Sequence, residues 1–252
     1  NPYELNEEEE EVMSALEASI LNSQKLKEHM HFMFSHGSLY HISNNNLLFH
    51  GCIPMTEDGE FKKVKVDDKE LSGAKLFRYL DKAMRNAYYN SKDDEERAEA
   101  GELMWRLWLD KDSPLFGKDK MTTFERCFTS SKEAKKENTM PYYSLIERQD
   151  ICEKILEDFG IDSDKGVILN GHVPVKIKDG ESPIKGNGKL YVIDGGISKA
   201  YQKTTGIAGY TFIYNSRFMA LAEHMPYEKL KSDGTQVFHS PKVQVVKDMG
   251  RR

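Results

Sequence analysis

The sequence predicts a mixed α and β fold with one β-sheet or a pair of sheets as its core. Apolar residues recur at helical spacing through much of the first two thirds of the chain. From Gly166 onward the pattern changes to short strand-like runs separated by Gly, Asn and Pro. With 252 residues, the chain can bury a sizeable core as one large domain or two small ones.

The N-terminal third predicts one long helix followed by a β-hairpin. Asn6 and Glu9 form the pattern of a capping box ahead of an apolar helical repeat, and Gly37 is expected to end this helix. The runs "SLYHI" and "NLLFH" flank the turn "SNNN", which is typical of a hairpin. "FKKVKV" predicts a further short strand.

The middle of the chain is predicted to be helical. Helices are expected at about Gly73–Asn90 and Asp94–Leu109, and another over "SLIERQDICEKILEDFG", which Gly160 ends. Ser130–Thr139 is polar and predicts an exposed loop. The spacing of Trp105, Trp108 and Phe116 favours core positions for these aromatic side chains.

Net charge, the length of apolar stretches and the spacing of cysteines indicate which partners and which compartment to expect. The net charge of −5 gives no indication of binding to nucleic acid or to a membrane surface, and no apolar stretch approaches 18 residues. The three cysteines lie far apart without a CxxC pair, which favours a reducing compartment. We therefore expect a cytoplasmic protein with no nucleic-acid or membrane partner.

Two strand ends carry histidine beside glycine. "NLLFHGC" places His50 after three apolar residues, and "VILNGHVPV" places His172 after a similar run. Imidazole at a strand end is a common element of catalytic metal sites on rigid scaffolds. The alternative is that both histidines are ordinary polar residues where strands leave a sheet, and the sequence leaves this open.

A third strand end is followed by a candidate anion-binding loop. Asp194 ends "LYVID" and is followed by two glycines. The next stretch offers hydrogen-bond donors and backbone N–H groups suited to an anion. The candidates for substrate or phosphate binding are Ser198, Lys199, Lys203 and Thr205. A solvated turn between two strands explains the same residues equally well.

These stretches together resemble the bacterial class III fructose-1,6-bisphosphatases, a family of calcineurin-like metallophosphoesterases. The resemblance rests on "NPYELNEEEEEV", "LLFHGCIPM", "WLDKDSPLFGK", "NGHVPVK" and residues 180–216. It implies two packed β-sheets flanked by helices with a largely helical insertion. It also implies a phosphoric monoester hydrolase that removes the C1 phosphate of fructose 1,6-bisphosphate in gluconeogenesis.

The resemblance assigns metal-ligand roles to His50 and His172, which match the fourth and fifth ligand blocks of the superfamily. It implies two divalent ions, with manganese expected, about 3.5–4 Å apart. The blocks Asp-x-His, Gly-Asp-x-x-Asp-Arg and Gly-Asn-His occur nowhere in this sequence. We therefore expect the C-terminal portion of such an enzyme, inactive by itself. If it were active, Asp110, Asp112 and Asp194 would be the first carboxylates to consider.

The resemblance also divides the chain into three parts. Residues 1–50 enter the phosphoesterase core, residues 51–165 form a helical insertion over the site, and residues 166–252 complete the core. A bisphosphate needs a second anion site, and the insertion offers basic residues for it. These candidates are Arg78, Arg85, Arg106, Lys118 and Arg126, of which Arg126 is the preferred one.

Two other functions remain open at this point. The chain could belong to a different phosphoesterase on the same fold, or it could be a non-catalytic interaction or regulatory module that lacks the metal site. The retained His50 and His172 favour a truncated phosphatase over the module, because a degenerate relative would be expected to lose both. Assembly into a homo-oligomer is also expected to be possible.

Overall fold

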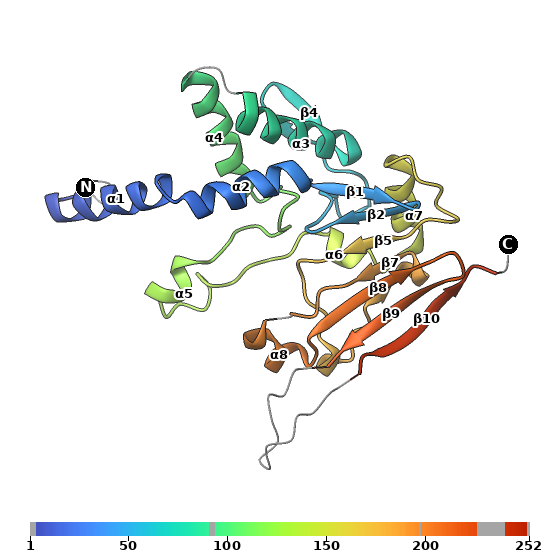
Figure 1. Ribbon diagram of the computed structural model, residues 1–252. Coiled ribbons are helices and arrows are strands. Elements are labelled where there is room, and N and C mark those ends of the chain that lie inside the picture. The colour runs from blue at the N-terminus through green and yellow to red at the C-terminus, as the bar shows by residue number, and fades with distance from the viewer. Residues whose placement is uncertain (1–3, 91–93, 197, 226–239, 251–252) are drawn as a thin grey trace, which may run out of the picture.

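The computed structural model describes residues 4–90, 94–196, 198–225 and 240–250 of the chain (Figure 1). The helices are α1 (Glu7–Leu21), α2 (Gln24–His36), α3 (Gly73–Asn90), α4 (Asp94–Leu109), α5 (Phe124–Phe128), α6 (Tyr142–Leu145), α7 (Gln149–Asp158) and α8 (Lys199–Thr205). The strands are β1 (Tyr40–Ser43), β2 (Asn46–Phe49), β3 (Val64–Val66), β4 (Lys69–Leu71), β5 (Ile168–Asn170), β6 (Ile184–Lys185), β7 (Leu190–Val192), β8 (Gly209–Tyr214), β9 (Phe218–His224) and β10 (Lys242–Asp248). Two short 3₁₀ turns lie at Ile177–Asp179 and Gly186–Gly188.

The main sheet has the strand order β1-β2-β5-β7-β6. Its three central strands, β2, β5 and β7, are parallel, whereas β1 and β6 pair antiparallel at its edges. The carboxyl ends of parallel neighbours meet at one edge of a sheet. Residues that follow β2, β5 and β7 are therefore brought together although they are far apart in the sequence.

One face of the main sheet is covered by helices. Leu47, Ile168 and Leu190 from the three parallel strands are buried in the same cluster as Phe77 of α3 and Ile155 of α7. Because these helices lie within residues 51–165, much of the predicted insertion packs into the core of the sheet. The proposed boundaries at residues 50 and 165 remain predictions.

The opposite face packs against a second sheet of order β10-β9-β8. Leu169 and Tyr191 of the main sheet share a buried cluster with Met219 of β9. The rings of Tyr191 and Phe212 lie 5.1 Å apart between their centroids, which joins the two sheets directly. Side chains on a strand alternate between faces, so the central strands are buried on both sides. The predicted mixed α and β architecture is confirmed.

Several local predictions are confirmed by the backbone. Asn6 and Glu9 form both hydrogen bonds of the capping box at α1. The hairpin β1–β2 turns at Asn44 and Asn45, whose φ angles of 51° and 63° are those that asparagine tolerates well. Gly160, at φ 76°, follows α7 and closes its end.

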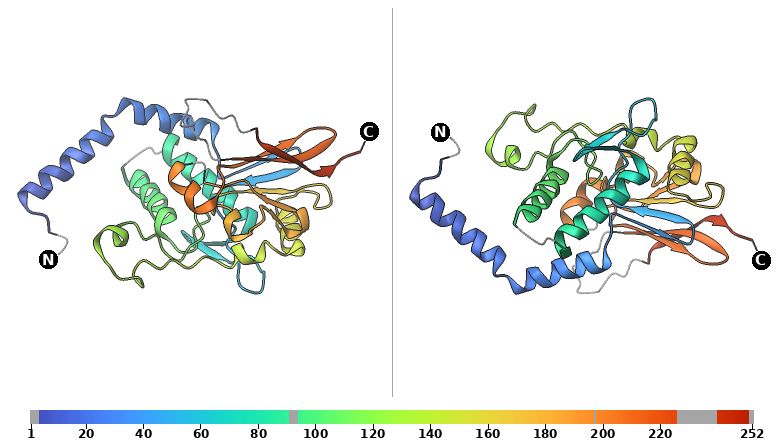
Figure 2. Two further views of the ribbon diagram at one scale, coloured as in Figure 1. Left: turned by 90° about the horizontal axis from the view of Figure 1, so that it is seen from below. Right: turned by 90° about the horizontal axis from the view of Figure 1, so that it is seen from above.

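The prediction of a single N-terminal helix is wrong, because the structure has two helices there. The break falls at Ser23, whose hydroxyl accepts a hydrogen bond of 3.2 Å from the N–H of Leu26 and starts α2. No described side chain of α1 is buried, and Figure 2 shows this helix extending away from the rest of the molecule. The predicted helix over 144–160 is likewise divided into α6 and α7.

The core positions predicted for two aromatic residues of α4 are also wrong. Trp105 and Trp108 are 62% and 55% exposed, whereas Phe116 is buried as expected. Helical spacing shows that side chains share a face, but it does not show whether another element covers that face. Among the described residues, no helix combines the length and the apolar character needed to cross a membrane.

Candidate active site

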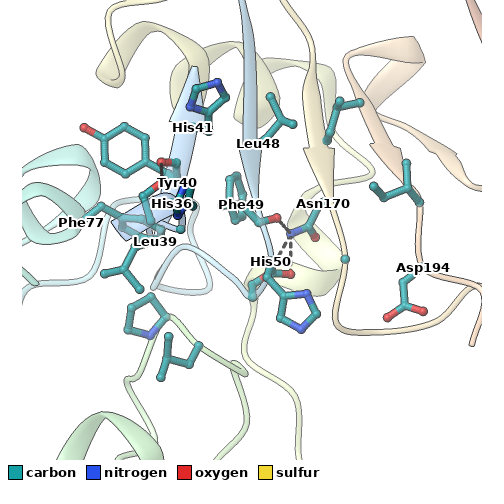
Figure 3. A pocket seen from close by; sticks show the side chains of 18 of the residues that line it. His36, Leu39, Tyr40, His41, Leu48, Phe49, His50, Phe77, Asn170 and Asp194 are labelled. Atoms are coloured by element: carbon teal, nitrogen blue, oxygen red, sulfur yellow. Dashed lines mark hydrogen bonds between the residues drawn. The ribbon is translucent and has the colours of Figure 1, made fainter. Parts of the chain in front are cut away.

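Three strand ends meet at one edge of the main sheet. His50 follows β2, Gly171 and His172 follow β5, and Asp194 lies just beyond β7. Figure 3 shows His50 and Asp194 at this edge, with Asn170 between them. His50 and Asp194 also line a cavity of about 900 Å³. The residues that follow these three strands therefore lie at one place in the fold.

The two imidazole rings are in direct contact. His172 Nδ1 lies 3.3 Å from His50 Nε2, and the ring planes are inclined at 84°. Two nitrogens sharing one tetrahedral ion at bonds of about 2.0–2.1 Å lie about 3.3–3.4 Å apart. The separation therefore fits a pair of ligands to one ion, and it confirms the convergence of two residues 122 positions apart.

The backbone at His172 is held in an uncommon conformation. Its φ angle is 67°, in the left-handed region that non-glycine residues rarely adopt. The preceding Gly171 lies against His50, and a Cβ there would come within 3.1 Å of His50 Nδ1. Strained residues of this kind are concentrated at functional sites. The turn thus aims His172 at His50.

His172 is half-buried, and its surroundings favour the neutral imidazole. Burial is the main cause that lowers the pKa of His172, and His50 and Lys118 lower it further. Asp194 and Glu137 act in the opposite direction without reversing the shift. A neutral ring keeps the nitrogen lone pair that metal coordination requires.

Asn170 holds the turn after β2 in place. Its side-chain amide, 1% exposed, donates to the carbonyl oxygens of Phe49, His50 and Gly51 at 3.2, 3.2 and 2.8 Å. These contacts join β5 to the exit of β2 over about 120 positions of sequence. The backbone that carries His50 is thereby fixed relative to the residue that precedes Gly171.

Replacing Asn170 by alanine is expected to destabilise the chain by about 1–3 kcal/mol, because the amide's carbonyl partners lose their donor in a buried site. Urea unfolding of N170A would measure this loss. The matched control is N22A, which removes an exposed asparagine at the end of α1. Equal stability of N170A and N22A would show that Asn170 does not secure the turn.

A loop of the predicted insertion docks against the same turn. The N–H of Cys52 donates to the carbonyl of Pro114 at 2.9 Å. Gly51 has no room for a side chain, since a Cβ would lie 2.1 Å from the oxygen of Pro114. Gly117, at φ 60°, packs on Cys52, where a Cβ would lie 2.5 Å from the Sγ atom. Leu115 of this loop lines the cavity beside His50.

Lys118 follows this loop and pairs with Glu137 at 2.8 Å. The Glu137 carboxylate also accepts hydrogen bonds from the N–H and the hydroxyl of Thr122 at 2.9 and 2.7 Å, and Arg126 lies 3.4 Å away. Burial alone would raise the pKa of Glu137, but the bonds from Lys118 and Thr122 outweigh it and lower the pKa to about 2. Glu137 is therefore ionised in the folded protein near neutral pH.

Since the pKa of Glu137 is lowered in the folded chain, this carboxylate is expected to stabilise the fold above about pH 4.5 and to lose that contribution as the pH falls towards 2. Unfolding free energies of wild type and E137Q should therefore differ at pH 7 and converge towards pH 2. A difference that stays constant from pH 7 to pH 2 would contradict this. D119N, at another hydrogen-bonded carboxylate of the same region, serves as a comparison.

The predicted anion loop after Asp194 is partly a helix, α8. Ser198, just before this helix, and Lys203, within it, are exposed, and the side chain of Lys199 lies outside what the structure describes. The hydroxyl of Thr205 is buried and donates to the carbonyl of Ile207 at 3.0 Å, so it closes its own turn. Anion binding by these four residues stays a prediction, and the geometry gives Thr205 no support.

Other charged candidates of the insertion form ion pairs within it. Arg85 pairs with Asp81 and donates to backbone carbonyls of the α2 end, which makes it a structural link. Arg106 pairs with Asp110 at 3.3 Å, and Lys62 pairs with Asp112 at 2.6 Å. These two carboxylates are therefore engaged with cations of the insertion.

In the part of the chain that the structure describes, no group of three histidine, cysteine or acidic side chains is arranged to hold a metal ion. The site as described offers His50 and His172 as a pair, with Asp194 as a neighbour that acts on His172 through its charge. Sequence reasoning missed Asn170 and Glu137. Asn170 stands directly before the Gly-His pair, which was an available signal, whereas nothing near Glu137 in the sequence points to the site.

In open sheets with parallel strands, ligands bind at the carboxyl ends of the strands. The paired imidazoles of this α and β protein lie at that edge of its main sheet. The comparison with known families is specific: the model of "Firmicute fructose-1,6-bisphosphatase" matches residues 1–251. The chain belongs to this family.

Individual relatives agree with this assignment. A class 3 fructose-1,6-bisphosphatase of Clostridium tetani is 52% identical over 231 residues, covering 92% of this chain and 35% of the relative. That of Alkaliphilus metalliredigens is 48% identical over 256 residues, covering 100% of this chain and 38% of the relative. The chain thus spans little more than a third of the length of these relatives. No solved structure gives a significant match.

Proposed function

We propose that this chain forms part of a metal-dependent fructose-1,6-bisphosphatase that hydrolyses the C1 phosphate of fructose 1,6-bisphosphate. The relatives carry that activity in their names and cover the chain almost completely. The observation that carries the proposal is the 3.3 Å contact between His172 Nδ1 and His50 Nε2 at adjacent strand ends. The two packed sheets with helices on the outer face support a calcineurin-like metallophosphoesterase architecture.

In this proposal His50 and His172 are ligands of a divalent ion, and manganese is the expected metal. When bound, such ions would stabilise the charge that develops on the attacking and leaving oxygens of the phosphate. Burial keeps the His172 ring neutral and ready to coordinate, and Asn170 fixes the turn that carries His50. Gly51 and Gly171 allow close approach of neighbouring backbone and ring atoms.

The proposal also covers a pathway, a cellular location and an assembly state. Gluconeogenesis is the proposed pathway, because its chemistry requires removal of this phosphate. A cytoplasmic location is supported by three free cysteines, two of them buried. Assembly into a homo-oligomer stays a prediction.

The proposed activity is tested with the complete encoded protein. Phosphate release would be measured for fructose 1,6-bisphosphate and a panel of other sugar phosphates and nucleotides, with and without Mn²⁺. The proposal predicts Mn²⁺-dependent turnover that favours the bisphosphate. A stronger preference for a nucleotide would identify a different phosphoesterase on the same fold.

A non-catalytic interaction module is the second candidate. The observation in its favour is that no third metal ligand joins His50 and His172 among the described residues. Such a module would show no turnover of any phosphate ester even in the complete encoded protein. The same assay therefore separates the two functions.

A further inference from the structure

A cation of the insertion, Lys118, follows directly after Gly117, which packs on Cys52 two residues beyond His50. Lys118 Nζ is 2.8 Å from Glu137 Oε2, and its side chain is 29% exposed. Pro114 and Leu115 of the same loop line the cavity together with His50, so the segment that carries Lys118 borders the site. By contrast, Arg85 and Arg106 are engaged in links elsewhere in the insertion.

The loop before Lys118 fixes its position relative to His50. The contacts of Gly51 and Cys52 with Pro114 and Gly117 leave no space between the two segments. The N–H of Met140 donates to the carbonyl of Gly117 at 2.9 Å, which closes the segment from the other side. Lys118 therefore extends from a backbone that cannot shift independently of the histidine turn.

Glu137 orients Lys118 but leaves it able to bind a second partner. An ammonium group has three N–H donors, and Glu137 accepts one of them. The carboxylate is itself held by Thr122 and by Arg126, so the position of the ammonium is set before any ligand arrives. Lys118, Arg126 and Glu137 together carry one net positive charge, whereas Asp194 beyond β7 carries one negative charge.

We propose that Lys118 binds an oxygen of a phosphate group seated at His50 and His172, and that Glu137 acts as its positioning residue. The ligand class is a phosphate monoester or inorganic phosphate. Its identification with the C1 phosphate of a sugar bisphosphate rests on the proposed function, but the anion site itself does not. A charge-assisted bond from a held ammonium is among the strong hydrogen bonds of proteins.

The simpler role for this ion pair is to close the segment between Lys118 and Glu137. That role predicts a loss of stability on substitution and no effect on anions. The two roles are separated by titrating the 252-residue chain with inorganic phosphate, with binding followed by calorimetry or NMR. The variants are K118M, K118R and the matched control K120M, whose lysine donates to the carbonyl of Ala134 in the same loop.

K118M is expected to weaken phosphate binding about tenfold or more. K120M should stay within about twofold of wild type, and K118R should retain most of the affinity because it keeps the charge. A folded K118M that binds phosphate as wild type does would overturn the proposal. E137Q should weaken binding less than K118M, because the ammonium is kept but is less well positioned.

A second measurement does not depend on a variant that folds. Reductive methylation of lysine amines in the wild-type chain should be slowed at Lys118 by phosphate, and unchanged at Lys120. Equal labelling of Lys118 with and without phosphate would overturn the proposal. If K118M binds phosphate as wild type does while the complete encoded protein hydrolyses the bisphosphate, the role of Lys118 is contradicted and the proposed function stands. If phosphate protects Lys118 but the complete encoded protein turns over no phosphate ester, the proposed function is contradicted and the anion site stands.

Discussion

The 252-residue chain by itself is expected to release no phosphate from fructose 1,6-bisphosphate above the blank, even with Mn²⁺ present. A two-metal hydrolase needs ligands for both ions and a group that sets their separation. Among the described residues, His50 and His172 are the recognisable metal ligands, and two neutral rings leave most of the charge of two metal ions uncompensated. A second ion is therefore strongly disfavoured.

The measurement is phosphate release by the purified chain beside the complete encoded protein at equal molarity. If the two turn over at comparable rates, carboxylates of this chain must complete the site. Asp194 would be tested first, because it is the acidic residue of the three that lies at the strand ends. Asp110 and Asp112 would follow, although both are paired with cations of the insertion.

In the complete encoded protein, H50A and H172A are each expected to lower kcat/KM by more than about a hundredfold. Loss of a residue that merely supports a metal ligand costs about 10- to 100-fold in affinity or activity, and loss of a ligand should cost more. The matched control is H29A, at an exposed histidine of α2. Activity within a few-fold of wild type in H172A would show that the pair is not part of the site.

Local sequence patterns predicted much of the fold because they report local physics. The capping box at Asn6, the hairpin at Asn44 and Asn45, and the closure of α7 at Gly160 all depend on neighbours within a few residues. The break at Ser23 was also a local event, but the apolar repeat continues across it. The exposure of Trp105 depends on distant elements, and no local pattern reports those.

The sequence pointed to His50 and His172, which the fold brings together, but it did not point to the residues that support them. Glycine beside His50 and His172 at strand ends favoured a metal-ligand role, which stays a proposal, and parallel pairing of β2 with β5 brings the rings together. The contacts of Asn170 with the β2 exit join residues about 120 positions apart. The pairing of Glu137 with Lys118 depends on how a loop folds back. A single sequence carries no record of either contact.

The central claim is that His50 and His172 hold one common ion. Mn²⁺ at substoichiometric amounts broadens NMR signals of nearby nuclei, and weak binding in fast exchange suits this measurement. The imidazole ring protons of the eight histidines would be followed as Mn²⁺ is added to the chain. The account predicts that the ring signals of His50 and His172 broaden first and together, ahead of the other six. Broadening of only one of the two, or of another histidine before both, would contradict it.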